Sequence, residues 1–201
     1  MLAALPAGVG LSVLAGPILH LLYPAVPETA EAAAYHLTFL GLACVFVCLM
    51  VATNGVLQAY GHPLLPVISL LCGGVLKIVT NYLMVGDPAT GIRGAAVSTL
   101  YCYALIAVIN LAAIARLVPE RPGYISLFAK PVLLTAVMAL AARSGYGVFC
   151  RLLPESWAVL PAVLLAAVVY VVLALAIGAV TRQDLQTLPK GEKLADRLHL
   201  R

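Results

Sequence analysis

The sequence predicts an all-α integral membrane protein with six transmembrane helices, because its composition and its charge placement both exclude a soluble fold. Hydrophobic residues make up 63% of the 201 residues and charged residues only 10%, whereas a soluble domain carries about 25% charged residues. The charges are also unevenly placed. Long segments lack the polar stripe that a helix on the surface of a soluble protein needs. Residues 1–115 contain only Glu28, Glu31, Lys77, Asp87 and Arg93 as charged residues.

Six segments have the ~20 mostly apolar residues that a membrane-spanning helix needs. Two prolines, Pro6 and Pro17, interrupt the first segment, and the tight turn GHP separates the second from the third. The loops GDPATG, VPERPG and LPESW separate the later segments. Residues 1–181 are therefore expected to form the transmembrane region, and residues 182–201 a polar tail. The expected spans are about 2–23, 35–60, 64–85, 94–117, 131–150 and 157–180.

The basic residues predict the orientation of the chain, because cytoplasmic loops carry an excess of Lys and Arg. The loop between the fourth and fifth spans contains Arg116, Arg121 and Lys130, and the tail contains five more basic residues. The loops on the opposite side contain only Arg93 and Arg151. We therefore expect a multi-pass protein of the cell membrane with both termini in the cytoplasm. The net charge of +4 then reflects contacts with the lipid bilayer rather than with nucleic acid.

Polar side chains inside the expected spans are the candidate substrate-binding residues. Asn54 and Gln58 lie one helical turn apart on the second span, and Lys77 and Asn81 have the same spacing on the third. Because a tight turn joins these two helices, we expect the four side chains to face one another or a shared cavity. Lys77 lies ~20 Å from the cytoplasmic end of its helix, too deep for an easy reach to either membrane surface. Hydrogen bonding between helices is the alternative for the amides, including Asn110, and snorkelling or a structural pair is the alternative for Lys77.

The remaining residues give no sign of an enzyme. Arg93 and Arg143 stand near helix ends and are expected to reach the headgroups at the interface. The five cysteines lie in apolar runs and lack metal-ligand spacing. The sequence also has no Ser-His-Asp set, no HExxH motif and no P-loop. We therefore expect no catalysis, no metal and no cofactor.

Four stretches of the chain together resemble a known transporter family. GVLQAYGHPLLPVISLLCGGVLKIVTNYLMV resembles the Leu-Gln, Gly, Pro, Gly and Lys pattern of polysaccharide-biosynthesis and stage V sporulation protein B-type flippases. GIRGAAVSTLYCYALIAVIN is similar to the same family's Gly-Ile-x-Gly-Ala-Ala-x-Ser-Thr segment, and LPAGVGLSVLAGPILHLLYP and DLQTLPKGEKLADRL also fit. This family belongs to the multidrug, oligosaccharidyl-lipid and polysaccharide exporter superfamily. The resemblance implies the C-terminal part of a fourteen-helix, two-lobe transporter whose N-terminal lobe is missing here or supplied by a second chain.

The resemblance also implies a substrate, a lipid-linked saccharide such as a peptidoglycan or polysaccharide precursor, moved across the membrane in sporulation or cell-wall synthesis. Such a lipid carries pyrophosphate, so basic and amide groups like Lys77, Asn81, Asn54 and Gln58 suit a cavity that binds it. Two other functions stay open. One is part of a multidrug antiporter of the same superfamily, which intramembrane acids would favour, and the expected spans contain none. The other is a membrane scaffold that transports nothing.

The predicted orientation can be tested by cysteine labelling of intact cells. An impermeant thiol reagent should leave Ser126→Cys unlabelled, because the loop between the fourth and fifth spans faces the cytoplasm. The same reagent should label Ala89→Cys in the preceding loop. The reverse labelling pattern would contradict the orientation.

Overall fold

The computed structural model describes residues 2–88, 90–118, 124–151, 154 and 157–176, and these residues form helices and no strand. Five of the helices are long and apolar enough to cross a membrane, or six spans if the bent pair α1 and α2 counts as one. The helices are α1 (Ala4–Val13), α2 (Ala15–Leu22), α3 (Pro27–Ala59), α4 (Leu64–Val85), α5 (Arg93–Leu117), α6 (Tyr124–Phe149) and α7 (Val159–Ala176).

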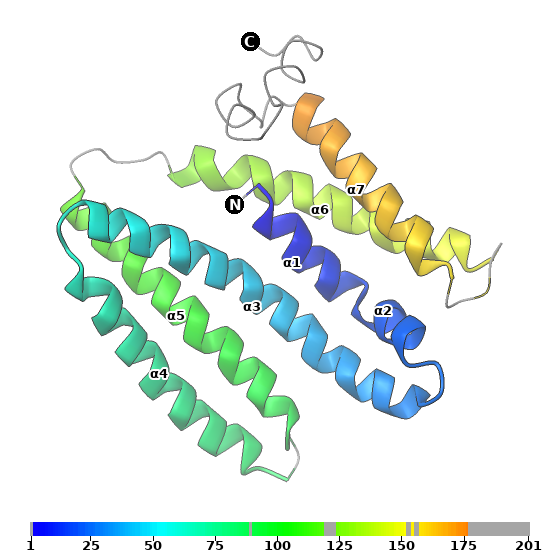
Figure 1. The fold of residues 1–201 in the computed structure, drawn as a ribbon, viewed down its shortest axis with the longest axis horizontal. Helices are drawn as coiled ribbons and strands as arrows, with labels where there is room; N and C mark the ends of the chain where they lie inside the picture. Colours follow the sequence, from blue (N-terminus) through cyan, green and yellow to red (C-terminus); the bar gives the residue numbers. More distant parts are fainter. Residues whose placement is uncertain (1, 89, 119–123, 152–153, 155–156, 177–201) are drawn as a thin grey trace.

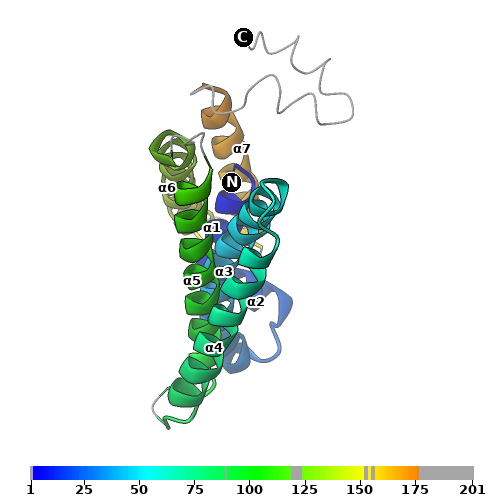
Figure 2. The same cartoon turned by 90° about the vertical axis from the view of Figure 1, so that its left-hand side faces the viewer.

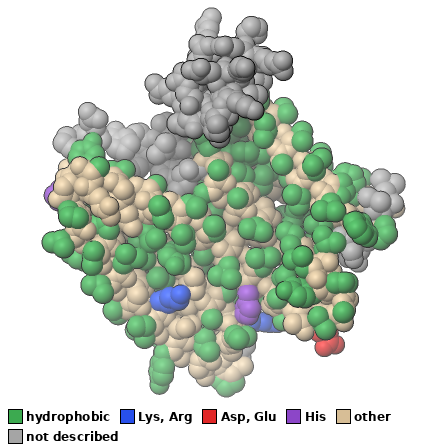
Figure 3. Space-filling model, in the orientation of Figure 1, with side chains coloured by type: hydrophobic (Ala, Val, Ile, Leu, Met, Phe, Trp, Pro, Cys, Tyr) green, Lys and Arg blue, Asp and Glu red, His purple; other side chains and the backbone are tan. Residues whose placement is uncertain are grey.

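The surface of the molecule is apolar, as an integral membrane protein requires. Large hydrophobic side chains are exposed on every long helix, for example Val51 on α3, Ile78 on α4 and Leu164 on α7. Figure 3 shows one face on which hydrophobic side chains and backbone predominate and charged side chains are few and isolated. Water would not solvate such a surface, whereas lipid tails match it.

Helix α5 is central to one half of the bundle, because it packs along both α3 and α4 (Figure 1). Helices α6 and α7 pack on each other, and α1 joins the two halves by contacting both α3 and α6. Figure 2 shows the helices edge-on, where they form a slab much thinner than the width seen in Figure 1. Although a tight turn connects α3 and α4, these two helices hardly touch each other.

The first expected span is broken into two helices whose axes differ by 69°. Pro17 explains the position of the break. It has no N–H to bond the carbonyl of Val13, four residues earlier, and its ring clashes with that carbonyl. Helix α1 accordingly ends at Val13. Pro6 lies in the first turn of α1, where a missing N–H costs nothing.

Two helices begin several residues earlier than the apolar segments do. Helix α3 begins at Pro27, eight residues before the expected start, with Pro27 at its first position and Glu28 in its first turn. A proline and an acidic residue both favour a helix N-terminus, so α3 extends beyond the apolar stretch. Helix α6 begins at Tyr124 and contains Pro131, the expected start, in its interior. Helix α4 covers the expected 64–85 and α5 begins one residue early at Arg93, while residues 177–201 lie outside the described part.

Small residues let α1 and α3 cross with their backbones in close contact. A Cβ atom added at Gly8 would lie 2.5 Å from the carbonyl oxygen of Gly41, and one added at Gly41 would lie 2.7 Å from that of Gly8. The hydroxyl of Ser12 donates to the carbonyl of Thr38 at 2.7 Å, and the Thr38 hydroxyl lies 3.4 Å from the carbonyl of Ser12. Small residues spaced four apart are typical of close helix packing in membranes.

An apolar cluster and one hydrogen bond near the start of the chain join helices α6 and α7 to the first span. Leu14, at the break between α1 and α2, packs with residues of α6 and α7. The hydroxyl of Tyr170 on α7 donates to the carbonyl of Leu2. Both contacts tie the first span to α6 and α7. The buried members of the cluster are Leu14, Met138, Ala142 and Ala166.

The crossing of α1 and α3 can be tested by adding one methyl group. We expect Gly8→Ala to destabilise the protein by about 1–3 kcal/mol, because the new Cβ overlaps the backbone of Gly41. Gly55→Ala on α3 is the matched control, since a Cβ there meets nothing within 4 Å. Thermal unfolding in detergent should show a lower midpoint for Gly8→Ala only. Equal midpoints for the two variants would contradict the packing described here.

Candidate functional site

Lys77 lies on the side of α4 that contacts α5. One turn before it, a Cβ added at Gly73 would lie 2.5 Å from Ile106 of α5. One turn after it, Oδ1 of Asn81 accepts a 3.0 Å hydrogen bond from the hydroxyl of Ser98 of α5. Residues four apart share a helix face, so Lys77 stands between these two contacts. It is half-buried.

The ammonium group of Lys77 makes no hydrogen bond and no ion pair with any residue that the structure describes. A lysine at the centre of a membrane helix costs roughly 2.5–3.5 kcal/mol on insertion scales. An unpaired lysine in such a place therefore calls for water, a headgroup or an anionic ligand near it. Asn81 adds a second polar group, because its Nδ2 makes no hydrogen bond within the described ranges.

A second polar cluster lies between α3 and α5, around the fully buried Asn110. Its Nδ2 donates to Oδ1 of Asn54 at 2.7 Å and to Oγ1 of Thr53 at 3.0 Å. The Thr53 hydroxyl lies 2.8 Å from the carbonyl of Leu49 and 3.0 Å from that of Met50. Oδ1 of Asn110 is buried and has no hydrogen-bond partner among the described residues. Asn54 and Asn110 thus hold two helices together, as the alternative interpretation of these amides expects.

The expectation of one cavity shared by α3 and α4 is wrong within the described residues, because α5 packs between these helices. Asn54 reaches α5 at Asn110 and Asn81 reaches it at Ser98, positions separated by roughly 18 Å along a helix. Gln58 is exposed on α3 and contacts neither cluster. The sequence therefore placed the polar residues on the correct helices but not their partners.

Thr53 is a member of the site that the sequence analysis missed. Its hydroxyl already bonds the backbone of its own helix, a common arrangement that gives no signal in the sequence. Its position next to Asn54 was the available hint, because Asn110 bonds both residues.

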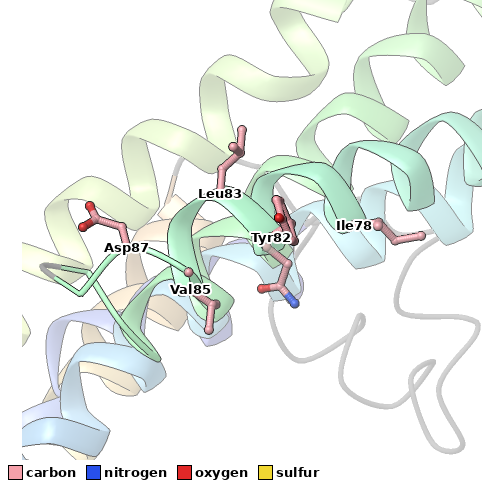
Figure 4. Close-up of a pocket in the computed structure, with 7 residues that line it drawn as sticks. Ile78, Tyr82, Leu83, Val85 and Asp87 are labelled. Atoms are coloured by element: carbon pink, nitrogen blue, oxygen red, sulfur yellow. The ribbon is translucent and has the colours of Figure 1, made fainter.

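An open hollow of about 770 Å³ surrounds the last turns of α4 and includes Asn81. Figure 4 shows that its labelled side chains all come from the end of α4 and the residues after it, and that they point in different directions. Tyr82, 82% exposed, is the aromatic residue of the hollow, and Asp87 the acidic one. An aromatic ring at a helix end is typical of the membrane interface. The lining residues are Ile78, Asn81, Tyr82, Leu83, Val85, Gly86 and Asp87.

The two arginines expected at the interface are both exposed. The guanidinium of Arg93 lies 5.3 Å from the centre of the Tyr35 ring, a cation–π contact between the start of α5 and α3. Arg143 stands six residues before the end of α6. Their contact with headgroups stays a prediction. Within the described ranges, no three His, Cys, Asp or Glu side chains gather to hold a metal ion.

Comparison with known proteins gives one distant similarity. The chain is 28% identical over 155 residues to the "Uncharacterized membrane protein YabM" of Bacillus subtilis (strain 168). The match covers 75% of this chain but 29% of that protein, so the chain spans less than a third of the length of this relative. No family model and no solved structure matches. This relative is named as a membrane protein, which agrees with the long apolar helices of this chain.

The contact between Asn54 and Asn110 can be measured with a double-mutant cycle. We expect Asn54→Leu and Asn110→Leu to show a coupling energy of about 0.6 kcal/mol, the average for hydrogen bonds between membrane helices, and at most about 1.7 kcal/mol. Gln58→Leu in place of Asn54→Leu is the control and should show no coupling with Asn110→Leu. The free energy of unfolding of each variant is measured in detergent. A coupling energy of zero for Asn54→Leu and Asn110→Leu would contradict the hydrogen bond.

Proposed function

We propose that this chain is part of a transporter that moves a lipid-linked saccharide across the cell membrane, with Lys77 as a contact for the pyrophosphate of the lipid. The supporting observation is the half-buried Lys77, which lies well inside helix α4 and whose ammonium makes no hydrogen bond or ion pair with the described residues. A leucine would be more favourable at a purely structural position, since it avoids the cost of the charge.

The groups around Lys77 suit an anion better than a cation. Asn81, one turn away, has an Nδ2 that can donate to phosphate oxygens. The nearest acidic residue along the chain is Asp87, ten residues after Lys77 and beyond the end of α4, while Glu28 and Glu31 lie near the start of α3. A cavity for cationic drugs would instead be expected to contain acids or aromatic rings near its centre. This difference favours the lipid-linked saccharide over a multidrug substrate.

In this proposal the chain works together with further helices, from a longer polypeptide or from a second chain. Transporters of this kind rock one helical body against another around a central site. The relative from Bacillus subtilis is more than three times as long as the segment that matches, which agrees with a larger machine. The exposed parts of α4 beside Lys77 would then face the central cavity.

Substitution of Lys77 in the complete transporter tests the proposal. Lys77→Gln should keep normal abundance but lower transport of the lipid at least tenfold, because the charge for the pyrophosphate is lost. Lys77→Arg should keep part of the activity, since its charge remains while its planar shape differs from an ammonium. Lys77→Leu should insert at least as well as the parent and be inactive.

Arg143→Gln is the matched control, because it removes a basic group from the exposed surface of α6 and should leave transport unchanged. Transport is measured as movement of a labelled lipid-linked saccharide in liposomes. A normal rate for Lys77→Leu would show that the lysine only snorkels to the interface and would refute the assignment.

A further inference from the structure

The hollow at the end of α4 is lined by groups that donate and accept hydrogen bonds. Asn81 uses its amide oxygen to accept from Ser98, and its amide nitrogen makes no hydrogen bond with the described residues. The hydroxyl of Tyr82 makes none with them either. Asp87 adds a carboxylate, which can accept several hydrogen bonds at once. The hollow therefore offers a ligand an amide donor, a hydroxyl and a carboxylate.

Tyr82 also gives the hollow an accessible aromatic face. Its side chain is largely exposed, and Figure 4 shows it between Ile78 and Asp87 along α4. The C–H groups on one face of a sugar ring are apolar and stack on an aromatic ring, while the hydroxyls at its edge need hydrogen-bond partners. An aromatic ring beside amide, hydroxyl and carboxylate groups meets both needs.

We propose that this hollow binds the saccharide headgroup of a lipid, with Tyr82 as the stacking surface and Asn81 and Asp87 as hydrogen-bond partners. Its volume of about 770 Å³ is within the range of roughly 300–1,000 Å³ that small-molecule sites have. The hollow is open and not enclosed. An opening suits a headgroup that is joined to a lipid tail, because the tail must continue into the bilayer.

The chemistry of the lining separates a saccharide from other ligands. No Lys, Arg or His is among the described residues that line the hollow, so a phosphate finds no cation there. An apolar molecule would leave the amide and the carboxylate without partners. An ammonium headgroup is the closest competitor, since the ring and the carboxylate both attract a cation. An ammonium group accepts no hydrogen bond, however, so the amide nitrogen of Asn81 favours the saccharide.

The hollow begins one helical turn after Lys77, and this link rests on the proposed function. Asn81 lies roughly 6 Å along the helix from Lys77, a distance comparable to the length of a pyrophosphate group. A pyrophosphate held at Lys77 would therefore bring the attached sugar to the hollow. The loop after α4 is expected to face the outside of the cell, so the hollow would hold the headgroup at the outer surface. Sugar binding in the hollow does not itself depend on Lys77.

Binding of amphiphiles that share one tail and differ in their headgroup tests the inference. The protein is placed in nanodiscs without glycolipid, and binding of radioactive dodecyl maltoside is measured below the concentration at which it forms micelles. We expect saturable binding that excess maltose displaces, because the headgroup is recognised. Dodecyltrimethylammonium and dodecyl phosphate, which have the same tail, should displace it poorly.

Variants of the lining show where the probe binds. Tyr82→Ala should weaken binding of dodecyl maltoside about tenfold, because the stacking surface is lost, whereas Tyr82→Phe keeps the ring and should retain most of the affinity. Asn81→Leu should also weaken binding, since the amide donor is removed. Tyr101→Ala is the matched control, because Tyr101 is an exposed tyrosine of α5 outside the hollow, and it should bind like the parent.

Lys77→Gln separates this inference from the proposed function. It should leave binding of dodecyl maltoside unchanged, because the probe has no phosphate, while it lowers transport if the pyrophosphate contact is correct. Normal transport with unchanged probe binding would refute the pyrophosphate contact and keep the saccharide site. Absence of saturable binding, or binding that Tyr82→Ala leaves intact, would overturn the saccharide site. Displacement by dodecyltrimethylammonium and not by maltose would also overturn it, in favour of an ammonium headgroup.

Discussion

Lipid tails offer no hydrogen bonds, so each polar group in a membrane helix must find its partner within the protein, and the arrangement of this chain depends on that constraint. Helix α5 supplies hydrogen-bond partners to two neighbouring helices. Asn110 donates to Asn54 and Thr53 of α3, and Ser98 donates to Asn81 of α4. The hydroxyl of Ser12 does the same between α1 and α3. Lys77 departs from this rule with a full charge, since none of the described residues forms a hydrogen bond or an ion pair with its ammonium. The proposed function of Lys77 rests on that missing partner.

Polar contacts between helices also require close backbones, because the side chains that make them are short. The crossing of α1 and α3 has glycines on both sides, Gly8 and Gly41. Helices α4 and α5 come together at Gly73 and Gly94, where an added Cβ would lie 2.5 Å from Ile106 and 2.6 Å from Met84, respectively. Many large apolar side chains are exposed on the outside, while others, such as Leu57, Ile106 and Leu134, are fully buried. The buried residues thus include small, polar and large apolar side chains.

The sequence predicted the membrane class and the range of α4 because both depend on local composition. It did not predict that α3 extends back to Pro27, since hydropathy detects the lipid-facing stretch and not the helix itself. Pro17 was recognised as an interruption, but the 69° bend became evident only from the structure. The partners of Asn54 and Asn81 could not be predicted, because each lies on α5, at a sequence separation of 56 and 17 residues. A tight turn makes two helices neighbours in sequence, and here α5 separates them in space.

The central claim is that Lys77 faces water within a transport cavity and not lipid. A single cysteine at this position in the complete protein, with the native cysteines replaced, tests it most directly, because a water-soluble thiol reagent reacts only with a hydrated thiolate. Leu140→Cys is the reference, since Leu140 is 69% exposed on the apolar surface of α6 and does not line the hollow at the end of α4. The account predicts that Lys77→Cys reacts at least tenfold faster than Leu140→Cys. Equally slow reaction at the two positions would contradict it.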